Sequence, residues 1–130
     1  MSEYGRTAEV EYSYSEAIEK TKEVLADHGF GVLSEIEVSE KLREKLDVEF
    51  DDYMILGACN PEKAYQGLQE EKELGLLLPC NVIVYRQDGK TFVSAIKASK
   101  ALEVAGNENL EPIAEEVEKD LEKVINEVKQ

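Results

Sequence analysis

The residues with the most reactive side chains in this sequence are two cysteines, each followed directly by an asparagine. Cys59-Asn60-Pro61 and Cys80-Asn81 both stand where one expected element ends and the next begins. Asn is a strong helix N-cap and Pro suits the first helical position, so Cys59 precedes a helix start whose free N–H groups can favour a thiolate. Cys59, Asn60, Pro61, Cys80 and Asn81 are therefore the candidate ligand-binding residues.

Three interpretations of the cysteine pair stay open. Free cysteines are common in protein cores as small hydrophobes, and the apolar flanks of both residues favour a protonated thiol. A redox pair or a soft-metal site is the second interpretation, because two thiolates could hold Cu(I), whereas zinc would need more ligands than Cys59 and Cys80 supply. A structural disulfide is the third. The spacing of the two residues is not that of a C-x-x-C motif.

No catalytic motif accompanies the cysteines. The sequence contains no nucleophile elbow, zinc-protease motif, phosphate loop or dinucleotide fingerprint. The single histidine, His28, precedes Gly29 at the expected end of a helix, where a cationic partner for the helix C-terminus is favoured over a catalytic base. Some aromatic residues could line a pocket, although residues at these spacings are more often core: Tyr53, Tyr65, Tyr85 and Phe92. The sequence favours a non-enzymatic domain and indicates no particular cofactor.

The composition is that of a strongly acidic chain. Its 130 residues include 29 Asp and Glu against 15 Lys and Arg, which gives a formal net charge of −14, and 42% are hydrophobic. This length fits a single domain, residues 1–130, with an ordinary core. The charge disfavours nucleic acid and anionic membranes as partners. The N-terminal residues lack a signal-peptide pattern and no apolar run is long enough to span a bilayer, so a cytoplasmic location is expected.

Hydrophobic periodicity predicts alternating strands and helices. Strands are expected at residues 7–12, 31–38, 53–59, 81–86 and 91–98. Helices are expected at residues 13–28, 39–46, 60–75 and 109–128. Ser13 and Glu16 have capping-box spacing, and Asp88-Gly89 predicts a type I′ hairpin turn. Helices interspersed with strands that can pair antiparallel indicate an α+β fold.

Several of these segments resemble the prokaryotic family called domain of unknown function 302. The segments that carry the resemblance are Gly29-Phe30-Gly31, Glu35-Ile36, Gly57-Ala58-Cys59-Asn60-Pro61 and Leu78-Pro79-Cys80-Asn81. The likeness runs from the first strand to the hairpin, and the two cysteines resemble one subgroup of the family. It implies a TBP-like α+β fold, with an antiparallel sheet packed by helices, and a homodimer formed by exchanging the hairpin of residues 81–98. It implies no activity.

Three hypotheses about function follow. The first is a dimeric small-ligand-binding or accessory module, with a small apolar pocket near Cys59, Asn60 and Cys80. The second is a thiol-dependent redox or soft-metal protein that uses Cys59 and Cys80. The third, which ranks last, is a hydrolytic or isomerising enzyme that uses His28 with a nearby carboxylate. The expected partners are a second copy of the chain and a small molecule or metal, with neither nucleic acid nor membrane.

Overall fold

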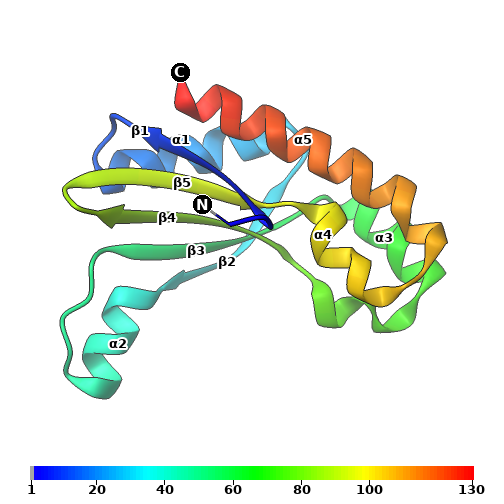
Figure 1. Ribbon diagram of the computed structural model, residues 1–130, viewed down its shortest axis with the longest axis horizontal. Coiled ribbons are helices and arrows are strands. Elements are labelled where there is room, and N and C mark those ends of the chain that lie inside the picture. Colours follow the sequence, from blue (N-terminus) through cyan, green and yellow to red (C-terminus); the bar gives the residue numbers. More distant parts are fainter. Residues whose placement is uncertain (1) are drawn as a thin grey trace.

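The structure is a computed structural model that describes residues 2–130 (Figure 1). Its helices and strands follow in the order β1 (Gly5–Val10), α1 (Tyr14–Asp27), β2 (Gly31–Glu37), α2 (Val38–Leu46), β3 (Tyr53–Cys59), α3 (Pro61–Glu70), β4 (Cys80–Gln87), β5 (Lys90–Ile96), α4 (Ala98–Leu102) and α5 (Glu111–Lys129). Three short 3-10 helices, η1 (Lys72–Leu77), η2 (Glu103–Ala105) and η3 (Glu108–Leu110), complete the chain.

All strands belong to one antiparallel sheet in the order β1-β5-β4-β3-β2. The strands β5, β4 and β3 are central, as expected for β3 from its apolar character on both faces. The hairpin between β4 and β5 turns at Asp88 and Gly89, which have φ values of 53° and 76°. Positive φ at both positions is what a type I′ turn requires, so the predicted turn is confirmed.

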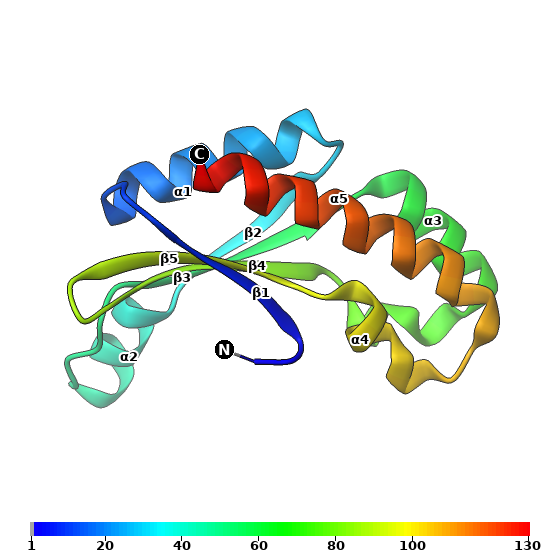
Figure 2. The same cartoon turned by 45° about the horizontal axis from the view of Figure 1, so that its top comes forward.

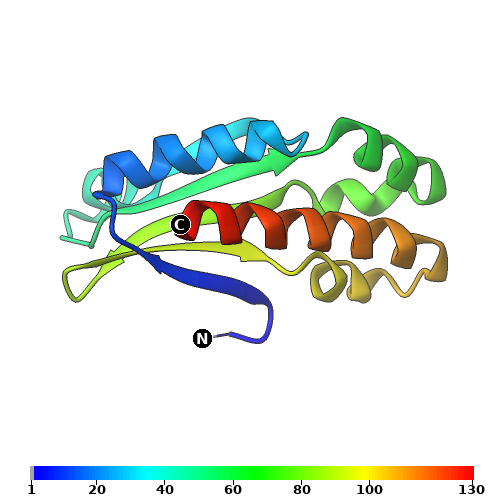
Figure 3. The same ribbon diagram turned by 90° about the horizontal axis from the view of Figure 1, so that it is seen from above.

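Helices α1 and α5 lie side by side across one face of the sheet (Figure 3). The helix residues that bury against it recur at three and four positions, as the periodicity predicted. On α1 these are Ala17, Ile18, Thr21, Val24 and Leu25, and on α5 they are Val117, Leu121, Val124, Ile125 and Val128. Alternate residues of the central strands complete the main core, among them Leu56, Val82, Val84 and Val93. The predicted α+β fold, with an antiparallel sheet packed by helices, is confirmed.

The start of α1 has the predicted capping box. The hydroxyl of Ser13 accepts a hydrogen bond from the backbone N–H of Glu16, and the carboxylate of Glu16 accepts one from the N–H of Ser13, both at 3.2 Å. At the other end His28 is the C-cap, and Gly29 follows with φ of 82°. Only glycine adopts that conformation at low cost, so the turn into β2 is set by sequence.

Some element boundaries differ from the prediction. The helix after Asn60 ends at Glu70 and is followed by η1, and the chain leaving β5 forms α4 instead of continuing as a strand to residue 98. The last helix begins at Glu111, while Asn107 caps the preceding η3. These turns surround a second, smaller core made of Leu74, Leu102, Leu110 and Ala114. Packing into this second core, rather than local propensity, sets those boundaries.

Candidate functional site

The first cysteine lies where β3 passes into α3. Cys59 is the last residue of β3, and Asn60 caps α3 by accepting a hydrogen bond on Oδ1 from the backbone N–H of Lys63 at 3.3 Å. Pro61 occupies the first turn of the helix, where its missing N–H costs nothing. The predicted strand-to-helix junction is therefore confirmed, and it fixes the backbone on both sides of Cys59.

The second cysteine reaches the same end of the sheet from the neighbouring strand. Cys80 is the first residue of β4 and lies opposite Ala58 in the β3–β4 register. A methyl group added to Gly57 would come within 2.9 Å of Cγ of Pro79, so the proline ring packs directly on that glycine. The bend at Pro79 thus places Cys80 at the end of the sheet where β3 passes into α3.

The glycine-flanked Phe30 completes this corner. Gly31 pairs with Cys59 in the β2–β3 register, and the side-chain amide of Asn60 lies 3.6 Å from the position a Cβ would take on Gly29. Phe30 between the two glycines is only 3% exposed and packs into the main core. The Gly-Phe-Gly and Cys-Asn-Pro segments, distant in sequence, therefore lie against each other.

A small apolar cavity lies at this corner, and we refer to it as the junction pocket. Its volume is about 30 Å³, which is room for about two or three atoms. The ends of β3 and β4 and the start of α3 contribute Ala58, Cys59, Asn60, Lys63 and Cys80 to its lining. Apolar side chains from the helices and turns close it: Phe30, Ala64, Leu74, Leu78, Leu102, Ile113 and Val117. Lys63 is the only charged residue in this lining, and its ammonium is paired with the carboxylate of Glu116.

Three of the five candidate ligand-binding residues border the junction pocket. These are Cys59, Asn60 and Cys80, whereas Pro61 is exposed on the first turn of α3. Asn81 follows Cys80 along β4 and lines a different surface, on the opposite face of the sheet. This difference follows from the strand, since successive side chains point to opposite faces.

Both cysteines are free thiols in a desolvating environment. Burial raises the pKa of Cys59 above its ordinary value, and burial together with the nearby Cys59 raises the pKa of Cys80 to about 11. The start of α3 therefore does not produce a thiolate at Cys59, because loss of hydration opposes the negative charge. Both side chains are neutral thiols at neutral pH, and a neutral thiol is a weak nucleophile.

The opposite side of the sheet carries a broad concave surface, which we refer to as the open face. It has a volume of about 1080 Å³ and is lined mainly by residues of the central strands. Helices α1 and α5 lie together on the other side of the sheet (Figure 2). The floor of the open face is a ladder of stacked rings in which Tyr53 and Tyr85 lie 5.7 Å apart and Tyr85 and Phe92 lie 5.3 Å apart. The ring of Phe50 packs at a tilt against the end of this ladder, with its centroid 6.1 Å from that of Tyr53.

The open face was not predicted as a site. The spacing of Tyr53, Tyr85 and Phe92 in the sequence favours core positions over a pocket, and no sequence pattern marks Phe50. Only the placement of both long helices on the other face leaves these residues accessible. Tyr65, the fourth aromatic residue noted, is exposed on α3.

His28 lies apart from both surfaces. Its Nε2 is 2.7 Å from a carboxylate oxygen of Glu127, so the pair ties the end of α1 to the end of α5. His28 lines neither the junction pocket nor the open face. This contact gives the histidine a structural role between two helices.

Residues 2–130 contain neither a cluster of metal-binding side chains nor a membrane-spanning helix. Within residues 2–130, no three His, Cys, Asp or Glu side chains are grouped so that they could hold a metal ion. None of the helices in that same part of the chain has the length and apolar character needed to cross a bilayer.

Comparison with known proteins identifies the family. A search among curated sequences gave no match. One solved structure is closely similar, with a TM-score of 0.91 and 32% sequence identity over 99% of this chain and 100% of the other; it is the crystal structure of an uncharacterized conserved protein DUF302 from Bacillus stearothermophilus. The family model for the domain of unknown function DUF302 matches residues 6–128. The chain therefore belongs to the DUF302 family, as the resemblance in its sequence implied.

Proposed function

We propose that this protein is a non-enzymatic, dimeric binding module whose small ligand enters the junction pocket. The observation that carries the proposal is the apolar cavity bordered by Cys59, Asn60 and Cys80 at the β3–α3 junction. Pockets with mostly apolar walls and a few polar groups are typical of small-molecule sites. Here the residues with polar groups are Asn60, Cys59, Cys80 and Lys63.

The size and charge of the junction pocket restrict its ligand. A cavity of about 30 Å³ accepts an apolar group of a few atoms, either a very small molecule or the end of a larger one. Lys63 is already paired with Glu116, and Glu62 and Asp120 act on the same ammonium. An anionic ligand would meet these carboxylates, so a neutral apolar group is the expected occupant.

Xenon and short alcohols test the proposed pocket. Xenon under pressure and alcohols of one or two carbons should each shift the methyl resonance of Ala58, which borders the cavity. Ala64→Leu would fill the pocket from α3 and abolish the shift, while Ala26→Leu, at an exposed position of α1, would leave it unchanged. Shifts that are absent in the wild type, or that persist in the Ala64 variant, would reject this site.

A thiol-dependent redox or soft-metal function is the second candidate. The observation that favours it is that both cysteines border one pocket. The raised pKa of each thiol works against it, since metal binding and thiol exchange both require a thiolate. Anaerobic titration with Cu(I) distinguishes the two candidates. Tight binding of one ion, lost in both Cys59→Ala and Cys80→Ala, would support the second candidate.

The dimer and the cytoplasmic location form part of the proposal. Exposed apolar side chains such as Tyr4, Leu46 and Phe50 support self-association, since isolated chains rarely present several of them together. Light scattering should give twice the chain mass of 14.6 kDa. Two free thiols suit a reducing compartment, and the net charge of −14 disfavours nucleic acid as a partner. A fractionation experiment and a DNA-binding assay check these two points.

A further inference from the structure

The open face has an unusual polarity for a surface in contact with water. An antiparallel sheet with one solvated face normally places polar residues there, alternating with the apolar residues of the core. Here the residues that point away from the helices are largely apolar or aromatic: Tyr53 and Ile55 on β3, Ile83 and Tyr85 on β4, and Phe92 and Ile96 on β5. No helix or strand formed by residues 2–130 covers the middle of this surface (Figure 1).

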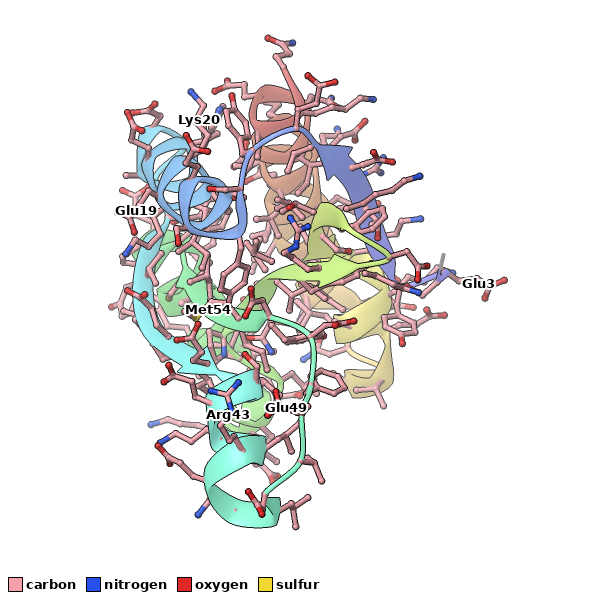
Figure 4. All side chains as sticks on the ribbon, turned by 90° about the vertical axis from the view of Figure 1, so that its left-hand side faces the viewer. Glu3, Glu19, Lys20, Arg43, Glu49 and Met54 are labelled. Carbon is pink, nitrogen blue, oxygen red and sulfur yellow. The ribbon has the colours of Figure 1, made fainter. Side chains whose placement is uncertain are left out.

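A projecting segment lies beside the open face. We refer to residues 38–52, which comprise α2 and the chain leading into β3, as the arm. Figure 4 shows Arg43 and Glu49 of the arm at one end of the molecule, while Glu19 and Lys20 of α1 lie at the other end. Arg43 and Glu49 form an ion pair at 3.7 Å, which links α2 to the segment that connects it with β3.

The arm carries apolar side chains that the rest of the chain does not bury. Leu46, Val48 and Phe50 are all exposed, and Ser39 is the only buried residue of α2. A short helix with one buried residue gains little from its own chain, because tertiary packing supplies most of the stability of protein helices. The arm and the open face are thus two apolar surfaces, side by side, that lack a covering layer.

Charge indicates what covers them. The charged residues that line the open face are Asp51, Arg86, Asp88 and Lys90, which sum to 2 − 2 = 0, although the whole chain carries −14. By contrast, the helix layer is acidic: α5 alone has seven acidic and three basic residues, or 3 − 7 = −4. Two copies of so acidic a chain repel each other over most of their surface. The arm is itself acidic, with six acidic and three basic residues, or 3 − 6 = −3. The neutral open face is therefore the surface that an acidic arm of a second copy can approach without that cost.

We propose that two copies of the chain pair through their open faces, with the arm of each packed against the sheet of the other. A two-fold arrangement brings the same apolar patch of each copy into contact and leaves both acidic helix layers on the outside. Each chain keeps its own β4–β5 hairpin in this arrangement. The inference rests on the dimer included in the proposed function and specifies the surface that forms it.

Matched pairs of charge substitutions test this interface by light scattering. Tyr4→Glu with Phe50→Glu introduces two charges at residues of the open face that are 63% and 48% exposed. Leu76→Glu with Val104→Glu introduces the same charge at residues outside it that are 81% and 76% exposed. The wild type and the second variant should have twice the chain mass, and the first variant should have the mass of one chain. Circular dichroism verifies that each variant is folded.

Each other outcome overturns a distinct part of the inference. If both double variants remain dimeric, the dimer is formed by another surface, for example by hairpin exchange. That result would reject the open-face interface but not the dimer. A variant outside the open face that dissociates also rejects this interface. A wild-type monomer rejects both. If the Tyr4 and Phe50 variant fails to fold, Leu46→Glu with Val48→Glu on the arm replaces it, with the same expected dissociation.

Discussion

Ala58 on β3 lies directly opposite Cys80 on β4, so Cys59 is offset by one residue from the second cysteine. Neighbouring residues on a strand point to opposite faces, so this offset gives the Cα–Cβ bonds of Cys59 and Cys80 different directions, although both residues border the junction pocket. Two cysteines whose Cβ vectors diverge cannot be bridged without backbone movement. We expect mild oxidant to leave Cys59 and Cys80 unbridged in the folded protein, and mass spectrometry of the alkylated protein checks this.

The raised pKa of Cys80 predicts a loss of stability in alkaline solution. Its pKa is about 11 in the folded chain against an ordinary value of 9.0, so the folded protein holds this proton more tightly than the unfolded chain does. The resulting stability is fully present below pH 9 and is lost as the pH rises towards 11. The free energy of unfolding, measured in urea, should fall less between pH 9 and 11 in Cys80→Ala than in the wild type.

Cys59→Ala is the control for this pH dependence. It should retain most of the loss, because burial is the largest cause of the raised pKa of Cys80 and Cys59 only adds to it. Equal slopes in the wild type and Cys80→Ala would show that the thiol is not desolvated in the folded protein.

Asn60 can be tested separately from the pocket it borders. Asn60→Ala removes the side-chain oxygen that caps α3 and should lower the free energy of unfolding by about 1 kcal/mol. Asn60→Asp keeps an oxygen acceptor at the cap and should stay close to the wild type. Thermal and urea denaturation compare the two. An alanine variant as stable as the aspartate variant would mean that the cap contributes nothing.

Local signals account for the parts of the fold and site that were predicted correctly. The Ser13 capping box, the Asn60-Pro61 helix start and the Asp88-Gly89 turn each satisfy backbone groups within a few residues, so short stretches of sequence suffice to identify them. Cys59 and Cys80 each stand at such a junction, and they share one corner because β3 and β4 are neighbours in the sheet.

The features that were missed depend on contacts between distant segments. The offset of Cys59 from Cys80 is set by the pairing register of β3 and β4, which neither strand encodes alone. The start of α5 is set by Leu110, which packs into the second core with Leu74 and Leu102. The open face is accessible because α1 and α5 both pack on the other side of the sheet. An aromatic residue on a central strand has the same sequence pattern on either face.

Gly57 is expected to tolerate no side chain. An added Cβ would clash with the hydroxyl oxygen of Ser34 and would lie 2.9 Å from Cγ of Pro79. Gly57→Ala should therefore lower the free energy of unfolding by about 1–3 kcal/mol through overpacking. Adding Ser34→Ala should restore only part of the loss, since the rigid proline ring remains. Gly75→Ala, where a Cβ would meet nothing within 4 Å, is the control and should be close to neutral.

Two buried threonines offer a matched test of hydrogen bonding in the core. The hydroxyl of Thr21 on α1 is buried and finds no hydrogen-bond partner among residues 2–130, whereas Thr91 on β5, also buried, accepts a hydrogen bond from the guanidinium of Arg86 at 2.9 Å. Thr21→Val replaces an unsatisfied hydroxyl with a methyl group of similar volume and should leave the free energy of unfolding unchanged or raise it by up to about 1 kcal/mol. Thr91→Val leaves the guanidinium without that acceptor and should cost about 1–2 kcal/mol. Urea denaturation of both variants measures the difference. Equal losses would show that the Thr21 hydroxyl has a partner in solution, such as a buried water, and that the interior beneath α1 is hydrated.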